Sequence, residues 1–260
     1  MNTSFNHEQI LNFAVKAGEV MLKSGAETYR VEDTISRILM VNHYHAVNTF
    51  VIPTGIIVTI EDPTFSMCTK VSRVKNRSTH LDRIELINQL SRDYVVGNIS
   101  LDEANKKLVE IETLSTYAPF TIILWVGISC AFFSIMFKGN TLDFFLTFMI
   151  GLLVGSLHYT LRRKYILNYF VLFICSLTIG FSVMSCYYIL GDKMHIEPIV
   201  IGCIMPLLPG VAFTNAIRDA IGDELLSGIS RAVEALLIAI SLAAGIGISL
   251  NIGFRLGGLL

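Results

Sequence analysis

The sequence predicts an α-helical integral membrane protein, with five transmembrane helices preceded by a small N-terminal cytoplasmic α+β domain. Of the 260 residues, 53% are hydrophobic and 16% are charged, and the mean hydropathy is +0.60. Soluble domains of this length are far less apolar. The charge is also uneven, because residues 1–116 carry 26 of the 41 charged side chains (20 basic and 21 acidic). The expected division is therefore a soluble domain, 1–116, and a membrane domain, 117–260.

The soluble domain opens with two helical patterns. Residues 6–23 repeat apolar side chains at helical spacing, which predicts a first helix. Ser24, followed three residues later by Glu27, is typical of a capping box and predicts a second helix through Leu39. Because the first thirty residues contain no continuous apolar core, we expect no secretory signal, and the domain should stay in the cytoplasm.

Three β-branched runs and two more helical patterns complete this domain. The runs lie within residues 47–74 and are separated by the turn sequences PTG and DP, which predicts an antiparallel meander of three strands. A helix with apolar residues at positions 81, 84, 87 and 90 follows, and another opens at Ser100 with Glu103 as its capping box. The expected element order is ααβββαα.

The membrane domain contains five stretches long and apolar enough to cross about 30 Å of hydrocarbon. The predicted spans are residues 118–137, 141–161, 166–190, 198–219 (broken at 206–210) and 228–254. Arg162, Arg163 and Lys164 follow the second span, which places that loop in the cytoplasm. We expect a multi-pass protein of the inner (plasma) membrane, with its N-terminus cytoplasmic and its C-terminus outside. Gly151 and Gly155 have the GxxxG spacing that permits close helix packing.

Two prolines and a glycine interrupt the fourth span. Pro206 and Pro209 lack an N–H group, so we expect them to free the carbonyl groups of Gly202 and Met205. Such groups are costly in lipid and should face protein, water or a ligand. A half-helix starting near Gly210 directs its N–H groups and its positive dipole end toward mid-membrane, which favours an anion. Pro206, Pro209 and Gly210 are therefore candidates for binding a carboxylate-bearing solute.

Polar residues follow this break. Asn215 and Asp219 are one turn apart on a single helix face with Arg218 beside them, and we expect Asn215 and Arg218 to orient the solute. Arg231 and Glu234 share a face of the next helix. An acid beside a basic neighbour can change protonation as a site opens and closes, so Asp219 and Glu234 are the predicted proton-coupling residues. The alternative is that these charged residues, Arg231 included, sit at the cytoplasmic interface and pair with one another.

A charged turn in the second helix of the soluble domain admits two interpretations. Arg30 and Glu32 are bunched there with Asp33, which suggests ligand sensing or a subunit contact. The alternative is a solvated helix surface, since Asp33 and Arg37 have the i,i+4 spacing of an ordinary surface pair.

Sequence patterns of catalysis are missing from the chain. It contains no GxSxG, no HExxH and no spaced aspartate pair of an intramembrane protease, and its histidines and cysteines have no metal-like spacing. We therefore expect no enzyme, no cofactor and no metal site. A net charge of −1 gives no reason to expect nucleic acid as a partner.

Several motifs together resemble the threonine/serine exporter family, and within it the larger, YjjP-type component of the split form. They are "SGAETYRVEDTISRI", "PTGIIVTI", "LDRIELINQLSRDYVVGNISLDEA" and "PLLPGVAFTNAIRDAIGDELLSGISRAVEALLIA". The resemblance implies proton-driven export of L-threonine and L-serine, or of succinate-like dicarboxylates for the split pair. It also implies that six residues matching the last motif lie near the transport pathway: Pro206, Pro209, Gly210, Asn215, Asp219 and Glu234.

The resemblance further implies a partner. Fused family members carry a second membrane domain after this one, so we expect a separate small YjjB-type membrane subunit, and a higher oligomer is compatible with that arrangement. Two other functions remain open: a regulatory or assembly subunit without its own transport path, and a membrane hydrolase.

Overall fold

A computed structural model describes residues 3–63, 65–75, 77–114, 117–164 and 166–257. The chain divides into two compact units. The first unit is Met1–Ser115 with Gly210–Val233, and the second is Thr116–Pro209 with Glu234–Leu260. The expected boundary after residue 116 falls outside the described residues. Besides the N-terminal part of the chain, the first unit includes residues 210–233, whose side chains bond to the turn at residues 25–28.

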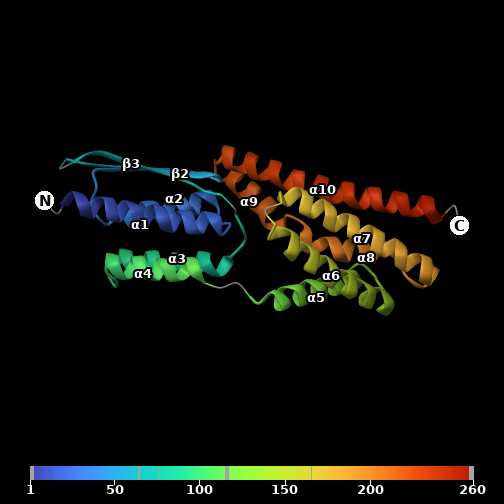
Figure 1. The fold of residues 1–260 in the computed structure, drawn as a ribbon. Helices are drawn as coiled ribbons and strands as arrows, with labels where there is room; N and C mark the ends of the chain where they lie inside the picture. The colour runs from blue at the N-terminus through green and yellow to red at the C-terminus, as the bar shows by residue number, and fades with distance from the viewer. Residues whose placement is uncertain (1–2, 64, 76, 115–116, 165, 258–260) are drawn as a thin grey trace. The chain divides into compact units, whose positions relative to one another are not determined.

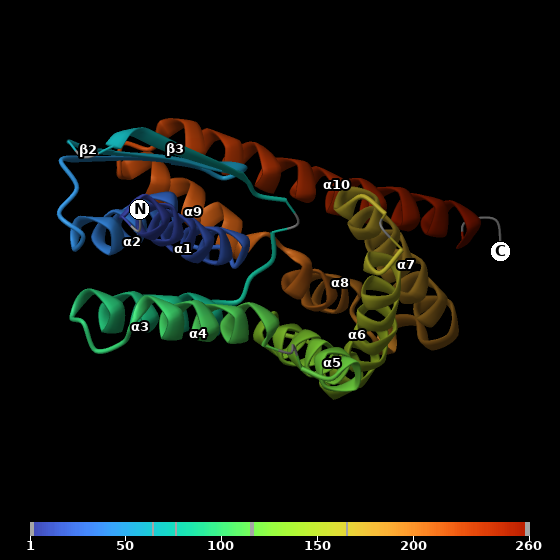
Figure 2. The ribbon, with the colours of Figure 1, turned by 60° about the vertical axis from the view of Figure 1, so that its left-hand side comes forward.

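The first unit contains the predicted ααβββαα order. Its elements are α1 (Thr3–Lys23), α2 (Thr28–Met40), β1 (Ala46–Ile52), β2 (Gly55–Asp62), β3 (Phe65–Arg73), α3 (Leu81–Val95), α4 (Leu101–Thr113) and α9 (Gly210–Ile221), with the start of α10 (Leu225–Gly257). Figures 1 and 2 show α1 and α2 between the sheet on one side and α3 with α4 on the other.

The sheet is the predicted antiparallel meander, in the order β1-β2-β3. Alternate residues of β2, Ile56, Val58 and Ile60, are completely buried and join the core that α1 and α2 provide. A strand with one apolar face needs such a cover, because successive side chains point to opposite faces of the sheet.

One of the two predicted capping boxes is confirmed. At α4 the Ser100 side chain accepts the N–H of Glu103, and the Glu103 carboxylate accepts the N–H of Ser100. The box predicted from Ser24 and Glu27 is wrong. Helix α2 begins at Thr28, and Glu27 is its N-cap residue without a side-chain capping bond. Its carboxylate binds two arginines instead, as described below.

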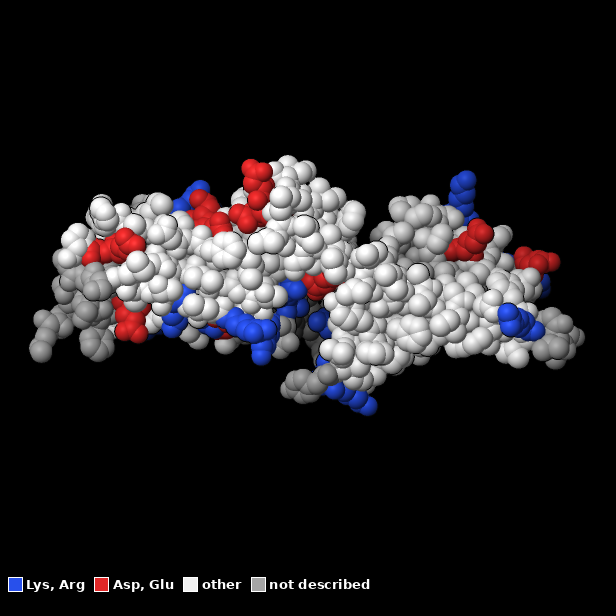
Figure 3. All heavy atoms as spheres, turned by 90° about the horizontal axis from the view of Figure 1, so that it is seen from above, with Lys and Arg blue, Asp and Glu red and all other residues white. Residues whose placement is uncertain are grey.

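The second unit consists of apolar helices. They are α5 (Pro119–Met136), α6 (Thr141–Arg162), α7 (Asn168–Leu190), α8 (Ile196–Ile204) and α10 from Glu234 onward, with the short 3-10 turns η1 (Gly191–Lys193) and η2 (Met205–Leu207). Four helices of the described chain are long and apolar enough to cross a membrane, or five spans if α8 and α9 count as one interrupted span. Figure 3 shows charged side chains gathered over the first unit and sparse along most of the second.

Close packing of α6 on α5 relies on small residues, as the GxxxG spacing predicts. A Cβ atom at Gly151 would lie 3.0 Å from the Cα of Gly127 and from the side chain of Cys130. Gly155 meets Val126 at 3.3 Å in the same way. The two helix backbones can approach this closely only because side chains are missing there.

The predicted break is present, but one of the two carbonyl groups expected to be unpaired there forms a hydrogen bond. Helix α8 ends at Ile204, η2 contains Pro206, and α9 begins at Gly210 as expected. The carbonyl of Met205, expected to be unpaired, accepts the N–H of Leu208 at 3.3 Å. The chain tightens into a 3-10 turn before Pro209, and such a turn re-satisfies a carbonyl that the proline cannot bond. The freed carbonyl of Gly202 stays a prediction.

Helix α10 is longer than predicted. The predicted fifth span begins at residue 228, whereas the helix begins at Leu225. Gly228 is a packing residue, because a Cβ atom there would lie 2.9 Å from the carbonyl oxygen of Ala216 and from the side chain of Ala220 in α9. A glycine that permits helix contact looks the same in the sequence as one that ends a helix.

Gly202→Ala should destabilise the second unit. A Cβ atom at Gly202 would lie 2.7 Å from the carbonyl oxygen of Cys130 and 3.0 Å from the N–H of Ser134, both backbone groups of α5. Overpacking of this kind costs about 1–3 kcal/mol. Gly247→Ala in α10 is the matched control, because apart from the adjoining backbone of α10 no described atom lies within 4 Å of its added Cβ. Thermal unfolding of the purified chain in detergent should show a lower midpoint for Gly202→Ala alone, and equal midpoints would contradict this packing.

Candidate functional site

The turn between α1 and α2 places several backbone groups inside the first unit. Helix α1 ends at Lys23, and Gly25 follows with φ +91°, a left-handed conformation that favours glycine. The carbonyls of Gly25 and Ala26 and the N–H of Thr28 lie between the two helices. Groups in that position need partners from elsewhere.

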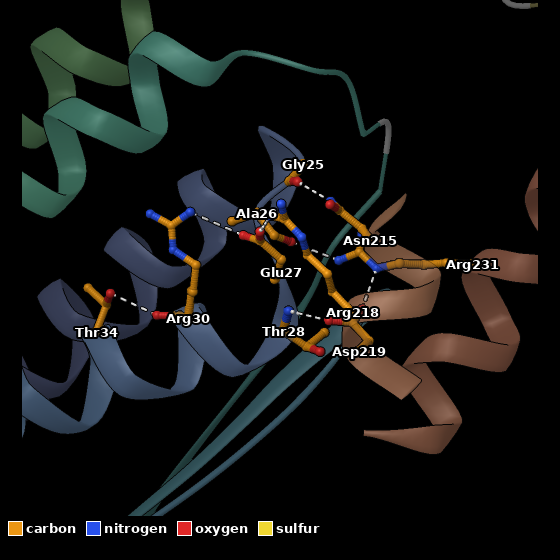
Figure 4. Close-up of polar contacts among 10 residues, drawn as sticks. All are labelled: Gly25, Ala26, Glu27, Thr28, Arg30, Thr34, Asn215, Arg218, Asp219 and Arg231. Carbon is orange, nitrogen blue, oxygen red and sulfur yellow. Dashed lines mark hydrogen bonds and ion pairs between the residues drawn. The ribbon is translucent and has the colours of Figure 1, made fainter. Parts of the chain in front are cut away.

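Side chains of α9 and α10 provide those partners, as Figure 4 shows. Asn215 donates to the carbonyl of Gly25 at 2.8 Å, and Arg231 donates through Nη2 to the carbonyl of Ala26 at 2.8 Å. The N–H of Thr28 donates to Oδ1 of Asp219 at 3.2 Å. Asp219 therefore takes the place of the missing N-terminal cap of α2, a helix position where a carboxylate is favourable.

Asp219 and Arg231 also form a buried ion pair. Arg231 Nε and Asp219 Oδ2 lie 2.9 Å apart, although the N–H direction does not give this contact hydrogen-bond geometry. The two side chains are 5% and 0% exposed. Because each charge is withdrawn from water, the removal of one would leave the other uncompensated.

On its exposed side the same turn carries a second cluster, centred on Glu27. Arg218 Nη1 donates to Oε1 of Glu27 at 2.7 Å, and Arg30 Nη1 donates to Oε2 at 3.2 Å. Burial alone would raise the pKa of Glu27. The hydrogen bonds from its own backbone N–H and from Arg218, together with the charge of Arg30, outweigh burial and lower this pKa below its ordinary value. Glu27 is therefore a carboxylate at neutral pH.

This cluster lines a pocket of about 710 Å³ within the first unit. Its charged lining is Arg30, Arg92 and Arg218 with Glu27 and Glu85. Three arginines against two glutamates leave an excess of positive charge. The first turn of α9 lines the pocket as well, and the N–H groups of a helix start favour an anion. The volume lies in the usual range for small-molecule sites.

The structure brings most of the predicted site residues together. Gly210, Asn215 and Arg218, predicted to bind solute, line the pocket with Arg30, which was predicted from a separate motif. Asp219 and Arg231 pair with each other, the arrangement that the alternative interpretation of the sequence expected.

Four other predicted residues are not part of this cluster. Pro206, Pro209 and Glu234 belong to the second unit. Glu32 accepts the N–H of Val51 at 2.7 Å and so connects α2 to β1. Burial raises the pKa of Glu32, and the negative charge of Glu224 raises it further. The hydrogen bond from Val51 lowers this pKa but does not outweigh burial. No contact of Glu32 in the described residues points to a ligand.

Three charged lining residues were not among the predicted site residues: Glu27, Glu85 and Arg92. Glu27 was assigned to a capping box, although Arg30 three residues later has the spacing of a helical ion pair. On α3, Glu85, Asn88 and Arg92 follow one another at helical spacing beside the apolar stripe. That polar stripe was the signal available for the α3 side of the pocket.

Comparisons with known proteins cover both units. A family model described as "Putative threonine/serine exporter" matches residues 12–253. The chain is 23% identical over 244 residues to the pheromone-regulated membrane protein 10 of Kluyveromyces lactis. This similarity covers 90% of the chain and 25% of the yeast protein, so the chain spans about a quarter of that relative's length. No solved structure gives a significant match.

Asp219→Asn should destabilise the first unit strongly. The variant retains an acceptor for the N–H of Thr28 but leaves the Arg231 charge buried without its counterion, which costs about 3–5 kcal/mol. Asp33→Asn is the matched control, because Asp33 forms a 2.8 Å ion pair with Arg37 on the exposed surface of α2. Exposed pairs contribute about 0–1 kcal/mol. Denaturant unfolding of the two variants measures the difference, and similar losses would contradict the importance of the buried pair.

Proposed function

Because the chain belongs to the threonine/serine exporter family, we propose that it is a subunit of a proton-coupled secondary exporter of small carboxylate-bearing solutes. The family and the apolar helices support a multi-pass membrane protein. The observation that carries the solute class is the pocket of the first unit, where three arginines and the start of a helix face one space.

The chemistry of this pocket suits a carboxylate. A guanidinium is planar, always charged and able to bind a carboxylate through two parallel N–H bonds. Arg218 and Arg30 each use one nitrogen for Glu27, and their side chains are 59% and 39% exposed. A solute entering from the exposed side therefore meets guanidinium groups first. L-Threonine, L-serine and succinate-like dicarboxylates all carry the group that this lining recognises, and Glu85 offers a carboxylate for the ammonium of an amino acid.

The break before α9 fits this role. Gly210 starts α9, and the turn with Pro206 and Pro209 fixes where that start lies in the chain. In this proposal the two prolines position the helix start, while Asn215 holds α9 against the turn at Gly25. Asn215 also lines the pocket, so it orients both the protein and the solute.

Proton coupling is proposed at Asp219 or Glu234. Asp219 is fully buried, and its neighbour in sequence, Arg218, lines the pocket. Protonation of Asp219 would weaken its attraction to Arg231 and its bond to the N–H of Thr28, next to Glu27. Glu234 lies half-buried in α10 at the start of a long apolar run, where an acid is costly unless it has a function.

We also propose the arrangement in the membrane. Five spans in the inner membrane, with α8 and α9 forming the interrupted one, leave the N-terminal part in the cytoplasm and the C-terminus outside. Arg162, Arg163 and Lys164 support this orientation, because cytoplasmic loops are enriched in such residues. An odd number of spans cannot be divided into two matching halves, which supports a small YjjB-type partner subunit and a higher oligomer.

A regulatory subunit is the second candidate function. Every residue that lines the pocket belongs to the first unit, including the residues of α3. A pocket formed in this way could sense a solute for a partner that performs the transport. Flux through the partner subunit alone would favour this candidate.

Arg218→Gln should reduce solute efflux at least about tenfold, because it removes a charged partner of the carboxylate. The measurement is efflux of labelled L-threonine and succinate from vesicles containing the chain and its partner subunit, under an imposed proton gradient. Arg37→Gln is the matched control, since Arg37 is an exposed arginine of α2 that does not line the pocket.

Two results would count against the proposal. Normal efflux by Arg218→Gln would remove the pocket from the transport path. Efflux that does not change with the imposed gradient would remove the proton coupling.

A further inference from the structure

We propose that Glu27 is a built-in competitor of the solute, a carboxylate of the protein that already binds one nitrogen of each of the two arginines, Arg30 and Arg218, that a solute carboxylate would bind. This inference rests on the proposed function, since it concerns the same pocket. It assigns Glu27 a specificity-determining role that its position as the N-cap residue of α2 does not require, because its side chain makes no capping bond there.

The geometry supports competition. Both carboxylate oxygens of Glu27 are engaged, Oε1 by Arg218 at 2.7 Å and Oε2 by Arg30 at 3.2 Å. One carboxylate thus bridges guanidinium groups from α9 and α2, as a bound solute would. The Glu27 side chain is only 7% exposed, whereas the two arginines reach into the pocket. An entering carboxylate therefore approaches guanidinium groups whose inner contacts are already occupied.

Other charges around Glu27 do not provide a substitute partner. Glu85, on the pocket side of α3, is itself an anion, and Arg92 donates to Gln89 of the same helix at 2.8 and 3.3 Å. On the buried side, Asp219 and Arg231 are committed to each other. A displaced Glu27 would lose its charge-assisted hydrogen bonds to Arg218 and Arg30.

Competition has a selective consequence. A ligand that binds the guanidinium groups must contribute enough binding free energy to displace Glu27. Its apparent affinity is therefore the intrinsic affinity multiplied by the fraction of molecules in which Glu27 has released the arginines. A neutral solute of the same shape gains nothing from that release. Glu27 therefore keeps both arginines paired when the pocket is empty, and it favours solutes that carry an anionic group.

The test compares Glu27→Gln with Glu85→Gln in the purified full-length chain. Both variants remove one negative charge from the pocket lining, but only Glu27 bridges the two arginines. Calorimetric titration with succinate, which has no ammonium group for Glu85 to bind, should show about tenfold tighter binding for Glu27→Gln, and about twofold or less for Glu85→Gln. Titration with succinamide, the neutral analogue of succinate, should show no such gain for either variant.

Glu27→Asp provides a second variant should Glu27→Gln fold poorly. The shorter side chain keeps the charge but cannot bridge both arginines equally well, so succinate should again bind more tightly than to the wild type, by a smaller factor. Thermal unfolding confirms that each variant is folded.

The outcomes separate the two proposals. Equal gains for Glu27→Gln and Glu85→Gln, or weaker binding by Glu27→Gln than by the wild type, overturn the competition while leaving the pocket as the solute site. If succinate and L-threonine bind to neither the wild type nor any variant, both the proposed solute site and this inference are wrong.

Discussion

The hydrogen bonds that α9 and α10 make to the turn between α1 and α2 are the interaction on which the structure of the first unit depends. Three backbone groups of this turn, at Gly25, Ala26 and Thr28, are bonded by Asn215, Arg231 and Asp219. Buried backbone groups without partners are costly, so the turn depends on these side chains. The reverse also holds, because the buried charges of Asp219 and Arg231 need the turn as well as each other. A segment that its apolar composition assigned to the membrane is thereby part of the same unit as the N-terminal helices.

The pocket follows from this constraint. Glu27 lies between Ala26 and Thr28, so the bonds that fix the turn also fix the carboxylate that Arg30 and Arg218 share. Arg218 precedes Asp219 on α9, which places one side of that helix in the pocket and the other in the buried pair. A solute that displaces Arg218 would also displace the next residue of α9, Asp219, which caps α2. In the proposed function, solute binding and a protonation change at Asp219 would therefore affect the same few residues.

Local sequence patterns predicted the elements well and the long-range contacts poorly. Periodicity identified the helices and the meander, and the box at Ser100 formed because both of its partners lie within one turn. The same pattern at Ser24 failed, since arginines bind the Glu27 carboxylate and an aspartate 191 residues away accepts the N–H of Thr28. No local signal distinguishes these cases, because the competing partners come from distant parts of the chain.

The candidate site shows the same limit. The face shared by Asn215 and Asp219 could be predicted from helical spacing, and both residues are buried. The contacts of that face could not be predicted, because a polar face in an apolar segment is compatible with a transport path and with a protein contact equally well. Gly228 illustrates the point for packing: it was predicted only as the start of the fifth span, and its missing side chain allows α10 to lie against α9.

The most direct test of the account is an experimental structure of the chain with the proposed partner subunit in saturating succinate. The account predicts solute density between Arg30 and Arg218 beside the first turn of α9, with the Glu27 carboxylate turned away from both guanidinium groups. Succinate bound elsewhere, with Glu27 still bridging the two arginines, would contradict it.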